Sequence, residues 1–396
     1  MRKEVIVGKI KVLLVDDSLF MRKMLAELLS SFSELEVVGA AMNGKDALDK
    51  IGRLHPQVVL LDINMPIMDG IECLKLSGEQ YPEVSFLIHS NLAPADADIT
   101  IKALRAGAID FIAKPNYVDL DSLATKQEEY LQKIRIAVNS KKRKKAVSEH
   151  APKLQKQSGK PTDKQLPTGK DKQQPVEKNG EESAEKDKQQ LTENDSVESM
   201  TIRYIAIGVS TGGPQALHRM MPELNGNLAA SLLIVQHMPA GYTDTLAQSL
   251  NRLSSIRVKE AEDGEVVMKQ CAYIAPGGYH MGVKNAKPGE LTIALSKEEP
   301  QNGLRPSFNV LLNSLCKADV KDLTVLVLTG MGNDGTMGIR ETKRRLENVF
   351  VIAQDEDSSI VHGMPGSAIR AGVVDLVLPL QEMASKINQI AAGEEL

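Results

Sequence analysis

Short apolar runs alternate with amphipathic segments along residues 10–138, and this alternation predicts strands and helices in turn. The predicted strands are Ile10–Val15, Glu36–Ala41, Val58–Ile63, Ser85–Ser90 and Asp110–Ala113. The predicted helices are Leu19–Leu29, Gly44–Leu54, Asp69–Gln80, Pro94–Ala106 and Asp119–Val138. Because the strands are almost continuously apolar and each is followed by a helix, we expect a buried parallel sheet with helices on both faces.

Residues 139–199 have a different composition. They contain no Phe, Tyr, Trp, Ile or Met and are rich in Lys, Gln, Glu, Asp, Ser and Pro. Such a segment cannot bury enough apolar surface to offset the entropy lost on ordering, so we predict a disordered linker. The basic run Lys141–Lys145 could contact nucleic acid, but we expect it to be the solvated end of a helix that leads into the linker.

The hydrophobic pattern of residues 200–393 predicts a second α/β domain. Apolar strands followed by helices are expected at Tyr204–Val209, Ser231–Gln236, Leu323–Leu328 and Val349–Ala353. Short strands between Gly and Pro turns are expected at Ile256–Ala261, Cys271–Ala275, His280–Val283 and Leu291–Leu295. We predict that these short strands form a small antiparallel section attached to a doubly wound parallel core.

Composition narrows the class of protein. The chain has 396 residues, enough for two or three domains, and its net charge of −4 offers no basic field for nucleic acid. Cys73, Cys271 and Cys316 are widely spaced, which argues against a zinc site and favours a reducing cytosol. The N-terminus lacks the apolar core of a signal peptide, and no apolar run is long enough to span a bilayer. We therefore expect a cytoplasmic protein without membrane insertion.

Polar side chains follow the predicted strands of the first domain. Asp16, Asp17 and Asp62 come where the first and third strands end, and Ser90 and Lys114 come where the fourth and fifth end. Ligands bind at this edge of an open α/β sheet. Converging carboxylates repel one another unless a cation binds, and Mg²⁺ prefers oxygen ligands. One carboxylate could then attack a phosphoryl group while the hydroxyl and the ammonium hold its oxygens.

Residues 10–130 resemble the response-regulator receiver domain, which has a flavodoxin-like fold. The resemblance rests on Val15–Ser18, Leu61–Gly70, Ser90 and Phe111–Pro115. Only His89–Asn91 departs from the small residues often found there.

The receiver resemblance implies a role for each strand-end residue. It implies that Asp62 accepts a phosphoryl group from a histidine kinase. It further implies that Mg²⁺ is bound by Asp16, Asp17, Asp62 and the backbone carbonyl of Asn64. Ser90 would be the switch hydroxyl, Phe111 the switch aromatic and Lys114 the partner of the phosphoryl group.

The second domain contains the stretch Gly208–Pro214 between an apolar strand and a predicted helix. Its G-x-S-x-G spacing is that of a nucleophile elbow, with Ser210 at a sharp turn. The free N–H groups at the start of the helix would favour a developing negative charge. The alternative is a turn that needs glycine only for its geometry. A phosphate loop is less consistent with the stretch, since no Gly-Lys-Ser/Thr follows.

A serine nucleophile needs a base and an acid that orients the base. His237 ends an apolar run and so reaches the same sheet edge as Ser210, although a structural or surface histidine is the alternative. Asp334 lies in a glycine-rich turn after another predicted strand, where it could instead cap a helix. The order Ser, His, Asp differs from the Ser, Asp, His of α/β-hydrolases, so that fold is not expected.

Residues 202–390 resemble the catalytic domain of the chemotaxis protein-glutamate methylesterase (CheB) family. The matching stretches are Ile207–Pro214, Val235–Pro239, Tyr273–Gly277 and Leu328–Gly335. The resemblance implies that Ser210 is the nucleophile, His237 the general base and then acid, and Asp334 the residue that orients His237. It also implies that the backbone N–H of Met331 helps to bind the oxyanion and that Thr211 lies beside the nucleophile.

The family resemblance also implies substrates and regulation. The substrates would be glutamate γ-methyl esters and certain glutamines on the cytoplasmic helices of chemoreceptors, hydrolysed without a cofactor. A chemotaxis histidine kinase would phosphorylate the receiver, which covers the active site until it is phosphorylated. We expect a monomer.

Two other classes of protein are weighed against this interpretation. A receiver-linked transcription factor would end in a compact helix-turn-helix, but residues 200–396 are too long and too rich in strands. A non-catalytic binding domain is disfavoured because Ser210, His237 and Asp334 are all present. Turnover of a methyl-esterified receptor would separate the enzyme from the binding domain.

Overall fold

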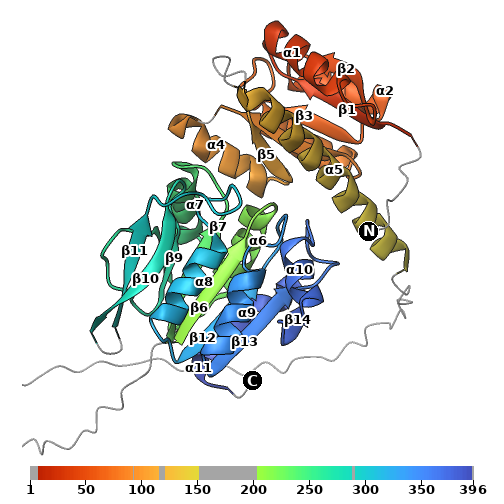
Figure 1. The fold of residues 1–396 in the computed structure, drawn as a ribbon. Helices are drawn as coiled ribbons and strands as arrows, with labels where there is room; N and C mark the ends of the chain where they lie inside the picture. The colour runs from red at the N-terminus through yellow and green to blue at the C-terminus, as the bar shows by residue number, and fades with distance from the viewer. Residues whose placement is uncertain (1–7, 92, 116–120, 151–202, 288–289, 395–396) are drawn as a thin grey trace, which may run out of the picture. The chain divides into compact units, whose positions relative to one another are not determined.

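The N-terminal region is built on a five-stranded parallel sheet with the strand order β2-β1-β3-β4-β5 (Figure 1). A computed structural model of the chain describes residues 8–91, 93–115, 121–150, 203–287 and 290–394. The strands are β1 (Ile10–Val15), β2 (Leu35–Ala41), β3 (Val58–Leu61), β4 (Ser85–Ser90) and β5 (Asp110–Ala113). The five predicted strands are confirmed, with ends that differ by at most two residues.

Helices cover both faces of this sheet. They are α1 (Leu19–Ser30), α2 (Gly44–Leu54), α3 (Gly70–Gln80), α4 (Pro94–Arg105) and α5 (Asp121–His150). Alternate residues of β1 explain the two layers, because successive side chains of a strand point to opposite faces. Leu13 and Val15 belong to the apolar cluster of α2, α3 and α4, whereas Val12 and Leu14 belong to that of α1 and α5.

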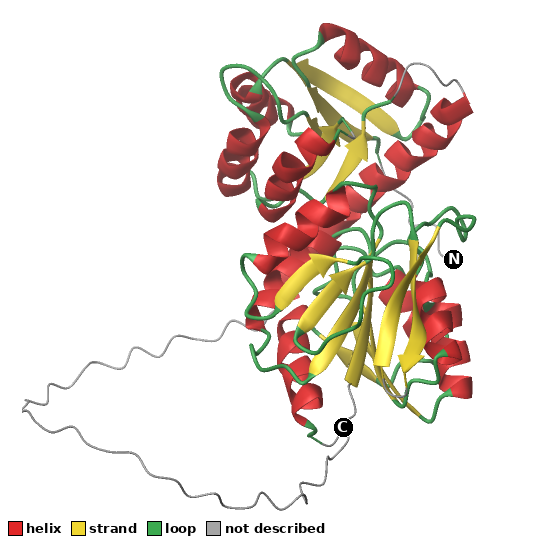
Figure 2. Ribbon diagram, turned by 90° about the vertical axis from the view of Figure 1, so that its left-hand side faces the viewer, coloured by secondary structure: helices red, strands yellow, loops and turns green. Residues whose placement is uncertain are grey.

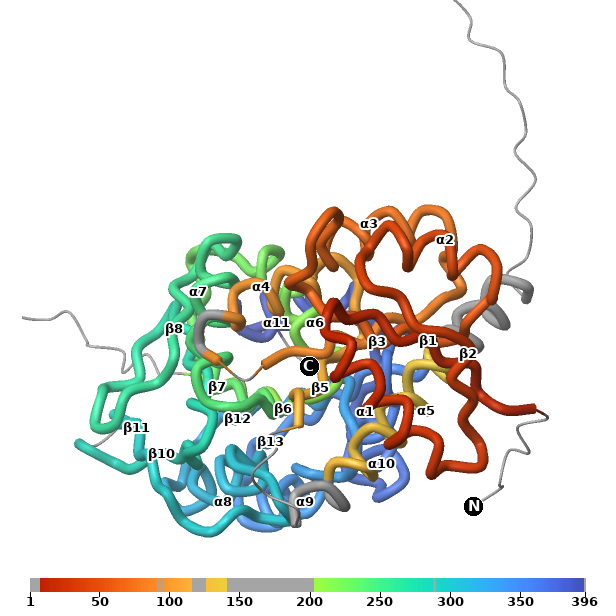
Figure 3. Tube along the Cα trace, turned by 90° about the horizontal axis from the view of Figure 1, so that it is seen from above, coloured from red at the N-terminus to blue at the C-terminus, as the bar shows by residue number. Residues whose placement is uncertain are grey.

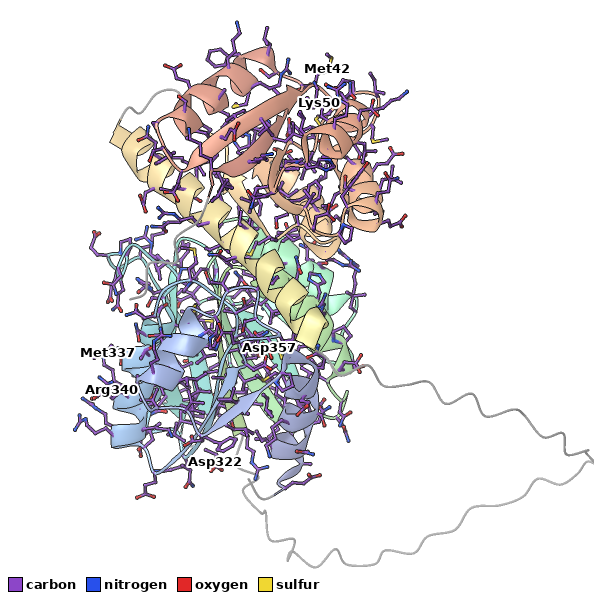
Figure 4. The ribbon with its side chains drawn as sticks, turned by 90° about the vertical axis from the view of Figure 1, so that its right-hand side faces the viewer. Met42, Lys50, Asp322, Met337, Arg340 and Asp357 are labelled. Carbon is purple, nitrogen blue, oxygen red and sulfur yellow. The ribbon has the colours of Figure 1, made fainter. Side chains whose placement is uncertain are left out.

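Side-chain caps set where three of these helices begin. Ser18, Asn43 and Asp69 each accept the N–H of the residue three positions later, as N-cap residues commonly do. The first turn of α2 is further held by an ion pair of 2.8 Å between Lys50 Nζ and Asp46 Oδ2. The backbone N–H of Met42, two residues before α2, donates to the same carboxylate oxygen at 3.1 Å; Figure 4 labels Met42 and Lys50. The helix starts therefore follow from local sequence.

The last helix of the region extends beyond its predicted end. The sequence predicts an end at Val138 and a disordered linker from residue 139, but α5 continues to His150. No Gly or Pro interrupts residues 139–150, and the Lys, Arg, Ala and Glu residues there favour helix. The prediction of disorder is wrong for residues 139–150, whereas the expectation that Lys141–Lys145 belongs to the end of a helix agrees with α5. The rest of the predicted linker, residues 151–199, lies outside the described residues.

The second region contains a seven-stranded sheet with the order β14-β13-β12-β6-β7-β9-β8. Its strands are β6 (Arg203–Val209), β7 (Ala230–Gln236), β8 (Arg257–Glu260), β9 (Cys271–Ile274), β12 (Asp322–Val327), β13 (Asn348–Gln354) and β14 (Leu376–Leu378). Every pair of neighbours is parallel. The doubly wound parallel core predicted from the sequence is confirmed.

The predicted antiparallel section is smaller than expected. Among the strands of the described residues, only β10 (His280–Lys287) and β11 (Glu290–Ser296) form an antiparallel pair, which lies beside α8 (Phe308–Lys317) (Figure 3). The strands β8 and β9 instead extend the parallel sheet, and β14 was not predicted. The segment between β8 and β9 makes the return that two parallel strands require. Within it, Val266 forms an isolated antiparallel bridge to Thr292 of β11.

Helices also cover both faces of the second sheet (Figure 2). They are α6 (Gly213–Met220), α7 (Tyr242–Asn251), α8 (Phe308–Lys317), α9 (Thr336–Arg345), α10 (Met364–Arg370) and α11 (Leu380–Ala392), with a short 3₁₀ turn at Met221–Glu223. One apolar cluster joins the sheet to α6, α7 and α11, and another joins it to α8, α9 and α10. On the outer side of α9, Met337 and Arg340 project from the surface (Figure 4). Among the described residues, no helix is long and apolar enough to cross a membrane.

The order of the strands places a crevice at the centre of this sheet. From β6 the chain proceeds outward through β7 to one edge, and from β12 it proceeds through β13 to the other edge. The neighbours β6 and β12 therefore mark the switch point of the sheet (Figure 1). Open α/β sheets bind ligands beyond the carboxyl ends of the strands at such a point.

Candidate active site and phosphorylation pocket

Ser210 lies directly beyond the carboxyl end of β6, where the strand turns into α6. Its backbone N–H donates to the carbonyl oxygen of Thr329 at 3.0 Å, which ties the turn to the end of β12. Gly212 has φ +79°, a value that side chains other than glycine adopt with strain. A Cβ atom on Gly330 would lie 2.8 Å from the Cβ of Ser210, so the neighbouring backbone must also be free of a side chain.

His237 and Asp334 are hydrogen-bonded to each other beside this turn. His237 follows β7, Asp334 lies in the turn between β12 and α9, and 2.9 Å separates His237 Nε2 from Asp334 Oδ2. Ser210, His237 and Asp334 all line one cavity of about 670 Å³. The three residues come from three adjacent strands, β12, β6 and β7, so the parallel sheet brings their ends to one edge.

The carboxylate of Asp334 is held by the start of α8. Its Oδ1 accepts the Ser307 hydroxyl at 3.0 Å and the Asn309 N–H at 3.1 Å, and its Oδ2 accepts the Phe308 N–H at 2.6 Å. Burial raises the pKa of Asp334, but the hydrogen bonds from His237 and from these N–H groups lower it below its ordinary value. Asp334 is thus kept ionised. It accepts the N–H groups at the start of α8 and does not cap α9, the helix that follows it in the chain.

Sequence reasoning missed Ser307 as part of this site. The residue precedes α8 and is fully buried, and its side chain makes no hydrogen bond to its own helix. Ser before an amphipathic helix is read as an ordinary N-cap, so the sequence held no signal for its bond to Asp334.

Two glycines bring α8 close to Asp334. A Cβ atom on Gly208 would lie 2.2 Å from Phe308 Cδ1, and one on Gly335 would lie 2.4 Å from the same atom. The Phe308 ring therefore packs directly against the backbone of β6 and of the turn that carries Asp334. Both glycines occur in the motifs read from the sequence, but their contact with Phe308 is a tertiary feature.

Two residues that line the cavity near Ser210 have backbone N–H groups available for a ligand. Thr211 and Met331 both line it. Within the described parts of the chain, no protein acceptor is hydrogen-bonded to the N–H of either residue. An N–H pair of this kind can hold a developing oxyanion.

In the N-terminal region, the carboxylates predicted to bind a metal converge. Ligand atoms of Asp16, Asp17 and Asp62 all lie within 4.8 Å of one another. Lys114 Nζ lies 3.0 Å from Asp16 Oδ2 and 2.8 Å from Asp62 Oδ2. Hard oxygen donors at this spacing suit Mg²⁺. The fourth predicted ligand is the backbone carbonyl of Asn64. The side chain of this residue donates a hydrogen bond from Nδ2 to Asp96 Oδ1 at 3.3 Å.

Charge and burial oppose each other in this pocket. Burial raises the pKa of Asp62, and Lys114 offsets this only in part. Burial lowers the pKa of Lys114, but Asp62 and Asp16 raise it above its ordinary value. Lys114 therefore stays charged and counterbalances the carboxylates.

The predicted switch residues contact Tyr242, the first residue of α7. The hydroxyl oxygens of Ser90 and Tyr242 are 3.3 Å apart, and the Tyr242 hydroxyl also donates to the Asn91 carbonyl at 2.9 Å. The rings of Phe111 and Tyr242 are stacked, with centroids 5.0 Å apart and planes at 6°. Ser90 also lies 3.0 Å from the Thr100 hydroxyl. The sequence offered no signal that Tyr242 would reach both switch residues.

Two other histidines, His218 and His89, have structural surroundings. His218 pairs with the Pro214 carbonyl at 2.7 Å and the Ser249 hydroxyl at 2.9 Å. His89 is buried, and its Nε2 lies 2.6 Å from the hydroxyl of Tyr130. His237 is thus the histidine that lines the cavity with Ser210.

Comparison with known proteins identifies both regions. Residues 205–387 match the family model of the CheB methylesterase, and residues 12–126 match that of the response regulator receiver domain. A protein-glutamate methylesterase/protein-glutamine glutaminase of Syntrophomonas wolfei is 39% identical over 385 residues, covering 95% of this chain and 98% of that protein. One from Halalkalibacterium halodurans is 41% identical over 383 residues, covering 96% and 98%.

The crystal structure of the Thermotoga maritima CheB methylesterase catalytic domain is 39% identical, with a TM-score of 0.46, and covers 48% of this chain and 98% of that one. The two family matches and the full-length relatives agree. The chain belongs to the protein-glutamate methylesterase/protein-glutamine glutaminase family, with a receiver domain ahead of a CheB methylesterase domain.

Proposed function

We propose that Ser210, His237 and Asp334 form the hydrolytic triad with which this protein demethylates glutamate γ-methyl esters on chemoreceptors and deamidates certain receptor glutamines. The relatives are named for both reactions. The observation that carries the triad is the 2.9 Å hydrogen bond between His237 and Asp334 in the cavity that Ser210 also lines.

The first half of the reaction follows from the protonation of His237. An ionised Asp334 accepts the Nε2–H, so the neutral ring offers its Nδ1 lone pair as the base. The Ser210 oxygen attacks the γ-carbonyl carbon while its proton passes to Nδ1. The tetrahedral intermediate collapses when Nδ1 returns the proton to the methoxy oxygen, which leaves as methanol and yields an acyl-enzyme.

The second half regenerates the enzyme. Water attacks the acyl carbon, its proton passes to Nδ1, and Ser210 leaves with that proton to give glutamate. A receptor glutamine follows the same route, with ammonia in place of methanol. The free N–H groups of Thr211 and Met331 supply hydrogen bonds to the oxyanion in both halves.

The receiver domain supplies the regulation in this proposal. Asp62 accepts the phosphoryl group from a histidine kinase, and Asp16, Asp17, Asp62 and the Asn64 carbonyl would hold Mg²⁺. When bound, Mg²⁺ neutralises the charge that develops on the transferred phosphoryl group. Lys114 is placed to pair with that group, because it already bridges Asp16 and Asp62.

The receiver and esterase residues belong to one compact unit. Contacts within this unit support the proposal that the receiver controls access to the active site, as a gate. Thr211 Oγ1 donates to Asp110 Oδ2 at 2.9 Å, so the residue after the nucleophile is bound by the receiver. Asp110, Phe111 and Lys133 line the cavity that contains Ser210. We infer that the unphosphorylated receiver restricts substrate entry and that phosphorylation releases it.

The experiment measures methanol release from methylated receptor membranes, with and without a small phosphodonor and Mg²⁺. Ser210→Ala is expected to abolish release, whereas Ser254→Ala, a serine outside the cavity, is expected to retain it. Release should rise with phosphodonor in the unchanged protein. Methanol release by Ser210→Ala would contradict the assignment of Ser210 as the nucleophile. Release that does not change with phosphodonor would contradict the proposed gate.

A further inference from the structure

A buried glutamine lies between the nucleophile and the base. Gln236 is the last residue of β7 and is 2% exposed. Its Nε2 donates to the carbonyl oxygen of Ser210 at 3.1 Å and to that of His237 at 3.2 Å. One carboxamide thus holds the backbone of both proposed catalytic residues.

The three peptide groups around Ser210 are each held from outside the turn. In the first, the Ser210 N–H donates to Thr329 O at 3.0 Å. In the second, Ser210 O accepts Gln236 Nε2 and the Gly213 N–H. In the third, Thr211 O accepts the Thr329 hydroxyl at 2.9 Å. The second peptide is the one that carries the Thr211 N–H.

The planarity of that second peptide gives the glutamine a catalytic consequence. In a trans peptide the C=O and the N–H point in opposite directions. A side chain that holds Ser210 O therefore also sets where the Thr211 N–H points. In a nucleophile elbow, the N–H after the serine is an oxyanion donor.

We propose that Gln236 is a positioning residue that aims the Thr211 N–H at the oxyanion. The inference rests on the proposed function, since it requires Ser210 to be the nucleophile. The Gly213 N–H holds the same carbonyl at 2.8 Å, but it belongs to the turn itself and moves with it. Gln236 belongs to the neighbouring strand β7, so it can hold the Ser210 carbonyl in place independently of the turn.

The surroundings of the carboxamide explain why the position suits an amide. A Cβ atom on Gly213 would lie 2.0 Å from Gln236 Oε1, so this glycine makes room for the side chain. Among the described residues, Oε1 is buried without a hydrogen-bond partner. A buried oxygen without a hydrogen-bond partner lowers the stability of the fold. The presence of glutamine at this position is therefore not explained by stability alone. The donated bonds of Nε2 are its distinctive contribution.

The test compares Gln236→Met with the unchanged protein. Methionine has a similar length and fills the space without donating a hydrogen bond. Removing an oxyanion donor outright costs about 10²–10³ in kcat, so a misaimed donor is expected to cost about 10- to 100-fold. KM for methylated receptor membranes should stay within about twofold, because ground-state binding does not use the donor.

The ratio of ester to amide turnover separates this role from damage to His237. A weakened proton donor slows the amide more than the ester, because the amine must be protonated before it leaves. A misaimed oxyanion donor slows both reactions by the same factor, so their ratio should not change in Gln236→Met. A change in the ratio would overturn the inference.

A matched control and a second variant complete the design. Ser231→Ala removes another buried donor to a carbonyl, the 2.6 Å bond to Met268 O at the opposite end of β7, and should leave kcat unchanged. Gln236→Glu places carboxyl oxygens against two carbonyls and should lose at least as much kcat as Gln236→Met.

The outcomes separate the inference from the proposed function. Native kcat in Gln236→Met, with Ser210→Ala inactive, would overturn the role of Gln236 and keep the triad. Methanol release by Ser210→Ala would instead contradict the proposed triad itself.

Discussion

His237 donates its Nε2–H to Asp334, with 2.9 Å between Nε2 and Oδ2. In the familiar serine protease arrangement the acid accepts from Nδ1 and the serine faces Nε2. In the triad proposed above the two nitrogens exchange roles, because the bond to Asp334 uses Nε2 and leaves Nδ1 for Ser210. The pattern of residue types does not reveal this exchange, because either ring nitrogen can serve as the base.

Asp334→Asn tests the role of the acid. An amide at this position can present its NH₂ group to Nε2, which favours the tautomer with the proton on Nδ1 and removes the base. We expect kcat for methanol release to fall by about 10³–10⁴, with little change in KM. The free energy of unfolding should be measured alongside, because Asp334 also accepts N–H groups from α8. A kcat within tenfold of the unchanged protein would contradict the role of Asp334.

Ser307→Ala removes one hydrogen bond from the acid. The lost bond should raise the pKa of Asp334 towards its ordinary value, since burial is then less fully compensated. Asp334 must be ionised, so the loss of activity on acidification should move to higher pH. The pH profile of kcat measures this shift. Ser314→Ala, on the same helix but bonded to Val283 and Leu311, should leave the profile unchanged.

Asp62→Asn tests the phosphoacceptor. Without the carboxylate, no acyl phosphate forms, so methanol release should stay at the level of the unphosphorylated protein when a small phosphodonor is added. Chelation of Mg²⁺ should have the same effect on the unchanged protein. Incorporation of phosphate can be followed directly in both cases. Stimulation that survives in Asp62→Asn would place the phosphorylation elsewhere.

Tyr242→Phe tests how the esterase domain senses the switch residues. The substitution keeps the ring against Phe111 but removes the hydroxyl that contacts Ser90 and Asn91. One or two hydrogen bonds contribute about 1–2 kcal/mol, so the activity of the unphosphorylated protein should rise by roughly 5- to 30-fold. Tyr273→Phe, which alters another buried tyrosine of the same domain, should not raise it. Equal basal activities in all three proteins would argue against this contact as part of the gate.

His218 is predicted to make the protein sensitive to acid. Burial lowers its pKa to about 4, with smaller contributions from Arg105 and Arg252. The native state therefore keeps His218 neutral, whereas the unfolded state takes up a proton near pH 6.5. Stability from this group is complete at pH 7 and is lost progressively as the pH falls from about 6.5 to 4, by up to about 3 kcal/mol.

Denaturant unfolding of His218→Gln against pH measures this contribution. Glutamine can still bond to the Pro214 carbonyl and the Ser249 hydroxyl but does not titrate. The free energy of unfolding of the variant should therefore fall less steeply between pH 6.5 and 4. Parallel curves for the two proteins would exclude His218 as the source of the acid sensitivity.

Local sequence predicted most of the fold and the candidate residues. The continuous apolar runs marked β1, β3, β6 and β7 because strands buried on both faces cannot alternate with polar residues. Strand-end positions picked out Asp62, Ser210 and His237, because parallel strands bring their carboxyl ends together. Local pattern failed for β8 and β9, whose partners are chosen by long-range pairing. For α5, polar composition predicted disorder from residue 139, whereas the helix propensity of the same residues continues the helix to His150.

The sequence by itself determined the two α/β domains, the acidic pocket and the residue types of the proposed triad, because these depend on local periodicity and on the ends of strands. Only the tertiary structure decided that α8 holds Asp334, that Nε2 rather than Nδ1 of His237 faces the acid, and that Gln236 holds Ser210 O. Each of these contacts joins residues from different elements at 2.6–3.1 Å. Packing sets such distances, and no spacing along the chain encodes them.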